Sequence, residues 1–211
     1  MSGGAVSAAR EAILSAVREA TAGGLAPEPV ERTYQRHGTR SRRERIALFA
    51  ERVDDYRATV RRVRASQLRA AIDELAPGRI GIPPGLVPEY RPGDAAEDHG
   101  LTPQELDALD GVVTGCTVAI AETGTLVLSG APNEGRRALT LVPDLHVCVV
   151  RARQIVETVP EAFDALGASA GRPLTFVSGP SATSDIELSR VEGVHGPRNL
   201  VVVIVEEDED E

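Results

Sequence analysis

The chain has no lysine and no tryptophan among its 211 residues, and its 23 basic residues are all arginine. A catalytic Schiff base and the lysine of a phosphate-binding P-loop both need the amine that is missing, so both chemistries are excluded. Aromatic residues make up only 3% of the chain, which leaves Val, Leu, Ile and Ala to build the core. A chain of this length can bury one sizeable core, and such an aliphatic core suits a layered α/β domain.

Thiols are scarce, because Cys116 and Cys148 are the only two cysteines. They form no CxxC pair and have no metal-ligand spacing. Both lie in apolar runs, where a free cysteine is usually a small buried hydrophobe. The chain alone therefore cannot build an iron–sulfur cluster or a structural zinc site, and we expect it to bind no metal.

Long apolar runs are also missing, since no segment approaches the roughly 20 apolar residues of a membrane span. The first residues lack the basic start and the apolar stretch of a signal peptide. We therefore expect a cytoplasmic protein that does not associate with a membrane.

The charge is distributed unevenly along the chain. Residues 1–79 carry 15 arginines against 10 acidic residues, whereas residues 80–211 carry 8 arginines against 22 acidic residues. A basic N-terminal third could contact nucleic acid, but an acidic body with few aromatics argues against that partner. A solvated basic helix that meets an acidic partner protein is favoured.

Helical periodicity predicts an N-terminal helical segment over residues 1–77 that packs on the core or docks to it. An amphipathic helix is expected at 5–21. A second, longer helix opens at Ser41, with Glu44 completing a capping box. Its apolar residues fall on one stripe, namely Ile46, Phe49, Val53, Tyr56, Val60 and Val63.

From residue 78 to residue 205 the pattern changes to short Val/Leu/Ile runs separated by turns and helical stretches. Such runs are typical of strands covered on both faces, so they predict an α/β domain with a mainly parallel sheet. The acidic run 206–211 is expected to be a disordered tail. Strands are predicted at 79–82, 111–114, 125–128, 146–150, 174–177 and 200–204, and helices at 135–141 and 154–166.

A first polar segment, 119–125, contains Glu122 beside two threonines and a glycine. Gly124 allows the backbone to approach a ligand closely, and the hydroxyls of Thr123 and Thr125 can donate or accept hydrogen bonds. Glu122 is a candidate general base or carboxylate nucleophile. The alternative is a tight turn in which the glutamate binds neighbouring backbone N–H groups.

A second polar segment, 178–187, is rich in hydroxyls and ends in an S-x-x-E capping box that predicts the start of a helix. The free N–H groups at such a start could bind an anion. Asp185 would repel an anionic ligand, so a helix cap without a ligand remains the alternative. The candidate ligand-binding residues of this segment and the loop after it are Ser178, Gly179, Ser181, Thr183, Asp185 and Gly196.

Histidine is the side chain whose unperturbed pKa lies nearest neutrality. His195 is the first candidate for acid–base chemistry, because it lies in a loop close in sequence to the second polar segment. The alternative is a purely structural role. His146, at the mouth of a predicted strand, is the weaker candidate.

These segments resemble a known family. The runs 119–125, 140–143 with His146, 178–181, 185–187 and 193–197 occur in an order similar to that of the LUD domain, and more closely that of the lactate-utilization protein C group. The resemblance covers about 78–205. It implies a three-layer α/β/α domain like the folds of sugar-phosphate isomerases and CoA-transferases. It also implies iron–sulfur partner proteins with which the chain oxidises L-lactate to pyruvate.

The resulting hypothesis is a subunit of a lactate-oxidising complex whose clusters lie on its partners. A small carboxylate would bind near His195 as the first-choice base and Glu122 as the second. A bidentate arginine would clamp the carboxylate, chosen from Arg136, Arg137 and Arg198. Two alternatives remain, a free-standing enzyme of the isomerase or transferase type and a non-catalytic regulatory module. Catalysis by this chain alone and homo-oligomerisation are left open.

Overall fold

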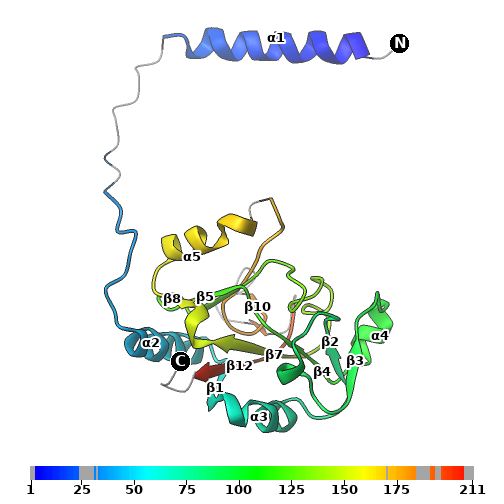
Figure 1. Ribbon diagram of the computed structural model, residues 1–211. Helices are drawn as coiled ribbons and strands as arrows, with labels where there is room; N and C mark the ends of the chain where they lie inside the picture. Colours follow the sequence, from blue (N-terminus) through cyan, green and yellow to red (C-terminus); the bar gives the residue numbers. More distant parts are fainter. Residues whose placement is uncertain are drawn as a thin grey trace. The chain divides into compact units, whose positions relative to one another are not determined.

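The computed structural model describes residues 3–23, 31, 33–169, 171–183, 191–192 and 196–206. The chain divides into two compact units, Met1–Tyr34 and Gln35–Glu211. The first contains helix α1 (Gly3–Thr21), which forms where the sequence predicts it and exposes Ile13 and Val17 (Figure 1). Within the described part of the chain, no helix combines the length and the apolar character needed to cross a membrane.

The second unit is built on a six-stranded sheet in which every neighbouring pair of strands is parallel. This confirms the predicted fold class. The inner strand β12 is buried from Leu200 to Val205, as expected for a parallel strand covered on both faces. The strand order is β1 (Thr59–Arg64), β12 (Asn199–Glu206), β7 (Leu145–Arg151), β4 (Gly111–Thr114), β2 (Ile80–Ile82) and β3 (Ala95–Glu97).

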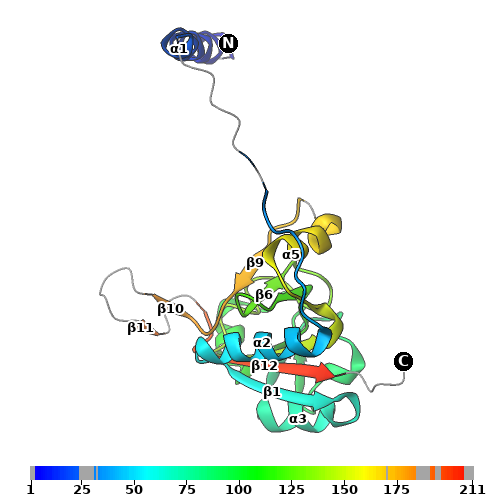
Figure 2. The ribbon, with the colours of Figure 1, turned by 90° about the vertical axis from the view of Figure 1, so that its left-hand side faces the viewer.

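Helices α2 (Arg42–Asp55) and α3 (Leu68–Leu75) lie on opposite sides of β1 and β12 (Figure 2). The predicted capping box of Ser41 and Glu44 starts α2. Phe49 of α2 is completely buried in a cluster with Cys148 and Ile204 on one face of the sheet. Ile72 of α3 is equally buried in the cluster on the other face. Two apolar clusters, one on each face, therefore hold the layers together.

A second, four-stranded sheet packs against the α2 side of the main sheet, because Ala119 and Leu126 belong to the same apolar cluster as Phe49. Helix α5 (Val159–Ala165) covers its outer face through Ala162. The predicted strands at 125–128 and 174–177 exist, but they pair antiparallel in this second sheet. Its order is β8 (Ile155–Val156), β5 (Val118–Ile120), β6 (Thr125–Leu128) and β9 (Thr175–Val177). The remaining elements are α4 (Pro103–Asp107), β10 (Ala182–Thr183), β11 (Val191–Glu192) and four short 3₁₀ turns at Ala65–Gln67, Pro88–Tyr90, Ala152–Gln154 and Leu166–Ser169.

The prediction of one long helix up to Val63 was wrong. Helix α2 ends at Asp55, and Arg57 adopts a left-handed backbone with φ of 64°. Val60 and Val63 lie on β1, which pairs with β12 along its whole length. The run Thr59–Arg64 is rich in β-branched residues, and the exposed edge of β12 offers it a ladder of backbone hydrogen bonds. Tertiary pairing therefore outweighed the helical spacing.

The prediction of a helix at 135–141 was also wrong, and the predicted helix at 154–166 is shortened to α5. Residues 137–141 form successive turns, and Gly135 ahead of them has a φ of 73°. Leu139 is completely buried against Leu106 and Val112. A left-handed glycine and one inward-facing leucine fix this segment as an irregular loop.

Residues 35–41, called here the strap, are tied to the start of α5 by carboxylates. The buried Glu157 accepts hydrogen bonds from the backbone N–H and the Nη1 of Arg40, each at 2.7 Å. Glu161 accepts from the N–H groups of Gly38, Glu157 and Thr158 at 3.0, 2.7 and 2.9 Å. Two carboxyl groups therefore hold the strap to the start of α5.

Burial by itself would raise the pKa of Glu161, but the backbone hydrogen bonds outweigh it and the pKa lies below the usual value. A lowered pKa in the folded state stabilises the fold above the unfolded value, about 4.3 for glutamate. That stabilisation is lost as the pH falls through the folded pKa.

We expect Glu161→Gln to lower the free energy of unfolding at pH 7 by about 1–3 kcal/mol, because its amide nitrogen would face backbone donors. The difference from the unsubstituted protein should shrink below about pH 4. Urea denaturation across the pH range measures it. Glu51→Gln, on an exposed part of α2, is the control and should change little. A difference between Glu161→Gln and the unsubstituted protein that is independent of pH would contradict the role given to this carboxylate.

Candidate functional site

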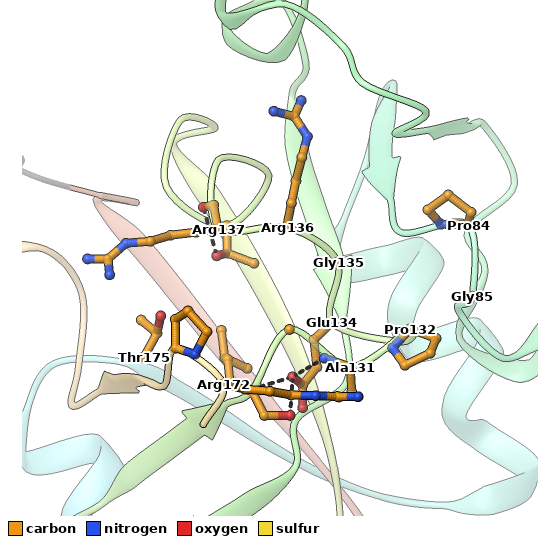
Figure 3. Close-up of a pocket in the computed structure, with 15 residues that line it drawn as sticks. Pro84, Gly85, Ala131, Pro132, Glu134, Gly135, Arg136, Arg137, Arg172 and Thr175 are labelled. Atoms are coloured by element: carbon orange, nitrogen blue, oxygen red, sulfur yellow. Dashed lines mark hydrogen bonds between the residues drawn. The ribbon is translucent and has the colours of Figure 1, made fainter. Parts of the chain in front are cut away.

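Two adjoining hollows lie beside the loop 129–142, which connects β6 to β7. The larger, called the large cleft, has a volume of about 650 Å³, and the smaller, called the small hollow, about 190 Å³. Arg137, Thr140 and Thr175 line both of them. Figure 3 shows the large cleft with the side chains that line it.

Glu134 shapes the loop that borders the large cleft. Its side chain is 1% exposed, and it accepts hydrogen bonds from Thr117 Oγ1 at 2.5 Å and from the N–H groups of Ser129 and Ala131 at 2.6 and 3.0 Å. These donors compensate the buried negative charge. The carboxylate therefore acts as an internal anchor for the loop and is not available to a ligand.

Two of the three predicted clamp arginines are already bound to carboxylates. Arg136 forms a bidentate pair with Asp98, with Nε–Oδ2 and Nη2–Oδ1 distances of 2.6 and 2.9 Å. Arg198 forms another with Asp144, with distances of 2.9 and 2.5 Å. Figure 3 shows Arg136 extending away from Arg137.

Burial alone would raise the pKa of Asp98, but hydrogen bonds from Arg136 and from the N–H groups of Leu101 and Gly100 outweigh it, so the pKa is lowered. Asp98 therefore stays ionised at neutral pH. It holds the guanidinium of Arg136 in a charge-assisted pair.

Arg137 and Arg172 differ from these two. No hydrogen bond or ion pair joins either guanidinium to another residue in the described part of the chain. Both arginines are exposed and line the large cleft, and Arg137 also lines the small hollow. A guanidinium always carries its charge and presents a planar fork to carboxylates and phosphates. The two arginines are therefore the cationic groups that these hollows can offer to an anion.

His146 forms part of the wall of the small hollow, although its side chain is 1% exposed. Its Nε2 lies 2.8 Å from Thr114 Oγ1, and that hydroxyl donates to the carbonyl of Gly115 at 2.9 Å. A tautomer protonated at Nε2 is compatible with both contacts and leaves Nδ1 as an acceptor nitrogen. Burial lowers the pKa of His146 to about 4. At neutral pH the imidazole is therefore an uncharged hydrogen-bond acceptor.

The two polar segments singled out in the sequence meet in the structure. Thr125 Oγ1 lies 2.7 Å from Ser178 Oγ and 2.7 Å from Thr123 Oγ1. This contact follows from the pairing of β6 with β9, which ends beside these residues. The three hydroxyls satisfy one another. The candidates that line the small hollow are Gly179, Ser181 and Gly196.

The other candidates are placed apart from these hollows. Glu122 is exposed in the turn between β5 and β6, where its N–H donates to the carbonyl of Glu157, and it lines neither hollow. Thr183 lies in β10. His195 and Asp185 lie outside the described residues, and their roles remain predictions.

Gly124 packs against protein. Its backbone has φ of 58°, and a Cβ there would lie 2.7 Å from the carbonyl carbon of Arg52 in α2. The close approach predicted for this glycine is therefore made to a neighbouring helix.

Sequence reasoning missed Arg172, Glu134 and Asp98. The run 129–137 carried a usable signal, because it holds two glycines, one glutamate and two adjacent arginines between apolar strands. No local pattern of this kind surrounds Arg172 or Asp98. Asp98 binds Arg136, and Arg172 lines the large cleft together with residues far away in sequence.

The two cysteines do not fit an iron–sulfur cluster. Both are buried, and a hydrogen bond to Cys148 together with burial raises the pKa of the Cys116 thiol. A cluster needs several thiolates. Among the residues that the structure describes, no group of three or more His, Cys, Asp or Glu side chains could hold a metal ion.

We expect Gly124→Ala to destabilise the protein by about 2–4 kcal/mol, because backbone strain adds to a clash with α2. Gly130→Ala is the matched control, since Gly130 has a similar φ of 68° and the nearest atom to an added Cβ is Gly135 O at 3.9 Å. It should cost about 1–2 kcal/mol from strain alone. Chemical denaturation measures both. Equal losses would show that contact with α2 does not constrain residue 124.

Comparison with known proteins agrees with this architecture. The LUD domain family model matches residues 6–205. The chain is 46% identical over 204 residues to "Lactate utilization protein C" of Deinococcus radiodurans, covering 92% of this chain and 93% of that protein. It is 34% identical over 95 residues to the protein of the same name from Bacillus pumilus, covering 42% of this chain and 39% of that one.

A crystal structure of a DUF162 family protein from Deinococcus radiodurans, at 1.70 Å resolution, matches with a TM-score of 0.70 and 43% identity. The match covers 79% of this chain and 99% of that chain. The family match, the full-length relative and the shared fold agree, and this chain belongs to the LUD domain family.

Proposed function

We propose that this chain serves lactate utilization by binding L-lactate, or its oxidation product pyruvate, in the small hollow. The names of its relatives support the pathway. The observation that carries the proposed ligand is Arg137, whose guanidinium has no partner among the described residues and lines a hollow of about 190 Å³. That volume suits a three-carbon acid.

The chemistry of the wall fits a hydroxy acid. Arg137 would bind the carboxylate through two parallel hydrogen bonds. In the tautomer protonated at Nε2, which donates to Thr114 Oγ1, Nδ1 of His146 would accept the hydroxyl hydrogen of lactate. Pyruvate has no such hydrogen to donate, so this acceptor favours lactate.

Oxidation of lactate to pyruvate breaks the O–H and the Cα–H bonds, and it releases either one proton and a hydride or two protons and two electrons. His146, with a pKa of about 4, is a poor base at neutral pH, and in this proposal it orients the hydroxyl. His195 remains the predicted proton acceptor. Because two buried cysteines cannot hold a cluster, the proposal assigns the electrons to iron–sulfur partner proteins.

We expect Arg137→Gln to weaken L-lactate binding by about 10-fold to 100-fold, the loss that follows when a charged hydrogen-bonding partner is removed. Isothermal titration calorimetry of the full chain measures it. Arg69→Gln is the matched control, because it removes the same charge from α3 on the opposite side of the main sheet. Equal affinity in Arg137→Gln and the unsubstituted protein would overturn the proposed site.

The partner half of the proposal needs a separate experiment. Tagged protein purified under anaerobic conditions from lactate-grown cells of its host should carry cysteine-rich partners. Iron, acid-labile sulfide and lactate-dependent dye reduction should be present in the eluate. A colourless single chain without iron would contradict a stable complex and leave the lactate-binding result unaffected.

A further inference from the structure

We propose that the large cleft is a second ligand site, for an organic phosphate whose apolar body lies along the cleft wall and whose phosphate binds Arg172. This site does not depend on the proposed lactate function. It differs from the small hollow in its volume, in its wall and in Arg172, which lines the large cleft and not the small hollow.

The volume sets the size of the ligand. The large cleft measures about 650 Å³, more than three times the 190 Å³ of the small hollow. Sites for cofactors and other ligands of similar size span roughly 300–1,000 Å³. A three-carbon acid would leave most of the cleft filled with water, so a larger molecule fits it.

The wall sets the character of the ligand body. Prolines contribute from three separate segments, Pro84 after β2, Pro132 in the loop after β6, and Pro173 before β9. Leu128 adds an aliphatic surface. Pro132 also supports the backbone at Gly85, where an added Cβ would lie 2.5 Å from Pro132 Cβ. Proline is conformationally stiff, and Pro132 packs closely against Gly85, so this part of the wall is formed before a ligand arrives and less entropy is lost on binding.

The charged side chains in the wall determine the charge of the ligand that the cleft favours. Of the ionisable side chains in this wall, Glu134 is satisfied by its own loop and Arg136 is neutralised by Asp98. Arg137 and Arg172 remain, and Figure 3 shows their side chains extending in opposite directions. The cleft is therefore cationic in a chain whose net charge is −9. Arginine binds phosphate through its planar fork, so an anionic group is expected at Arg172.

Titration calorimetry of the full chain against flavin mononucleotide, NAD and coenzyme A tests the proposal. Two fragments serve as control ligands. Riboflavin has the organic part of flavin mononucleotide without its phosphate, and inorganic phosphate has the anion without an organic part. We expect at least one of the three organic phosphates to bind with a Kd below about 0.1 mM, and the fragments to bind at least 10-fold more weakly. Binding of none of the three below about 1 mM would overturn the proposal.

Substitutions of Arg172 test whether the organic phosphate binds in the large cleft. Arg172→Gln should weaken the organic phosphate by about 10-fold or more, and Arg172→Lys, which keeps the charge without the fork, by less. Arg69→Gln should have no effect. Arg172 lines the large cleft but not the small hollow, so Arg172→Gln should leave L-lactate titrations unchanged. Undiminished binding of the organic phosphate by Arg172→Gln would overturn the proposed site, whatever the lactate result.

Discussion

The parallel pairing of β12 with β7 is the constraint on which the site depends. Its register sets seven residue pairs, from Asn199 beside Leu145, through Leu200 beside His146, to Val205 beside Arg151. A slip by one residue would turn every side chain of β12 to the opposite face of the sheet. Because Leu200 is fixed beside His146, Gly196 is carried to the same hollow. The last strand of the chain thus brings the segment before it to a histidine about 50 residues earlier in the sequence.

The carboxylates around the two hollows are paired inside the protein. Acidic residues outnumber basic ones in this half of the chain, yet the carboxylates nearest the large cleft are used inside the protein. Glu134 binds backbone donors and Asp98 holds Arg136. Each carboxylate holds a loop in place, and its donors within the protein occupy its oxygens. An acidic protein can therefore present two unpaired guanidinium groups, Arg137 and Arg172, to an anion.

Local rules succeeded where a segment decides its own structure. The capping box of Ser41 and Glu44 starts α2, as the sequence predicts. Apolar strand runs were found within a residue or two of their ends. The predictions were wrong where pairing with a strand far away in sequence determines the secondary structure. Val60 and Val63 fit a helical stripe equally well, and the open edge of β12 drew them into β1.

The candidate site divides in the same way. The sequence indicated two polar segments, and their hydroxyls do meet through Thr125 and Ser178. It named three candidate arginines for the carboxylate clamp, and their ion pairs with residues far away in sequence distinguish them. Asp98 and Asp144 hold two, which leaves Arg137. Arg172 was missed because nothing near it in sequence distinguishes it from any other surface arginine.

By itself, the sequence determined the α/β class with its mainly parallel sheet, the helix starts and the residue types available for chemistry. Composition, apolar patterning and capping are read within a few residues of the chain. The tertiary structure alone decided which strands share a sheet, which arginines stay unpaired among the described residues and which hydroxyl contacts His146. Those outcomes depend on contacts between residues tens of positions apart, such as Arg136 with Asp98 and Thr114 with His146, and no local pattern encodes such a contact.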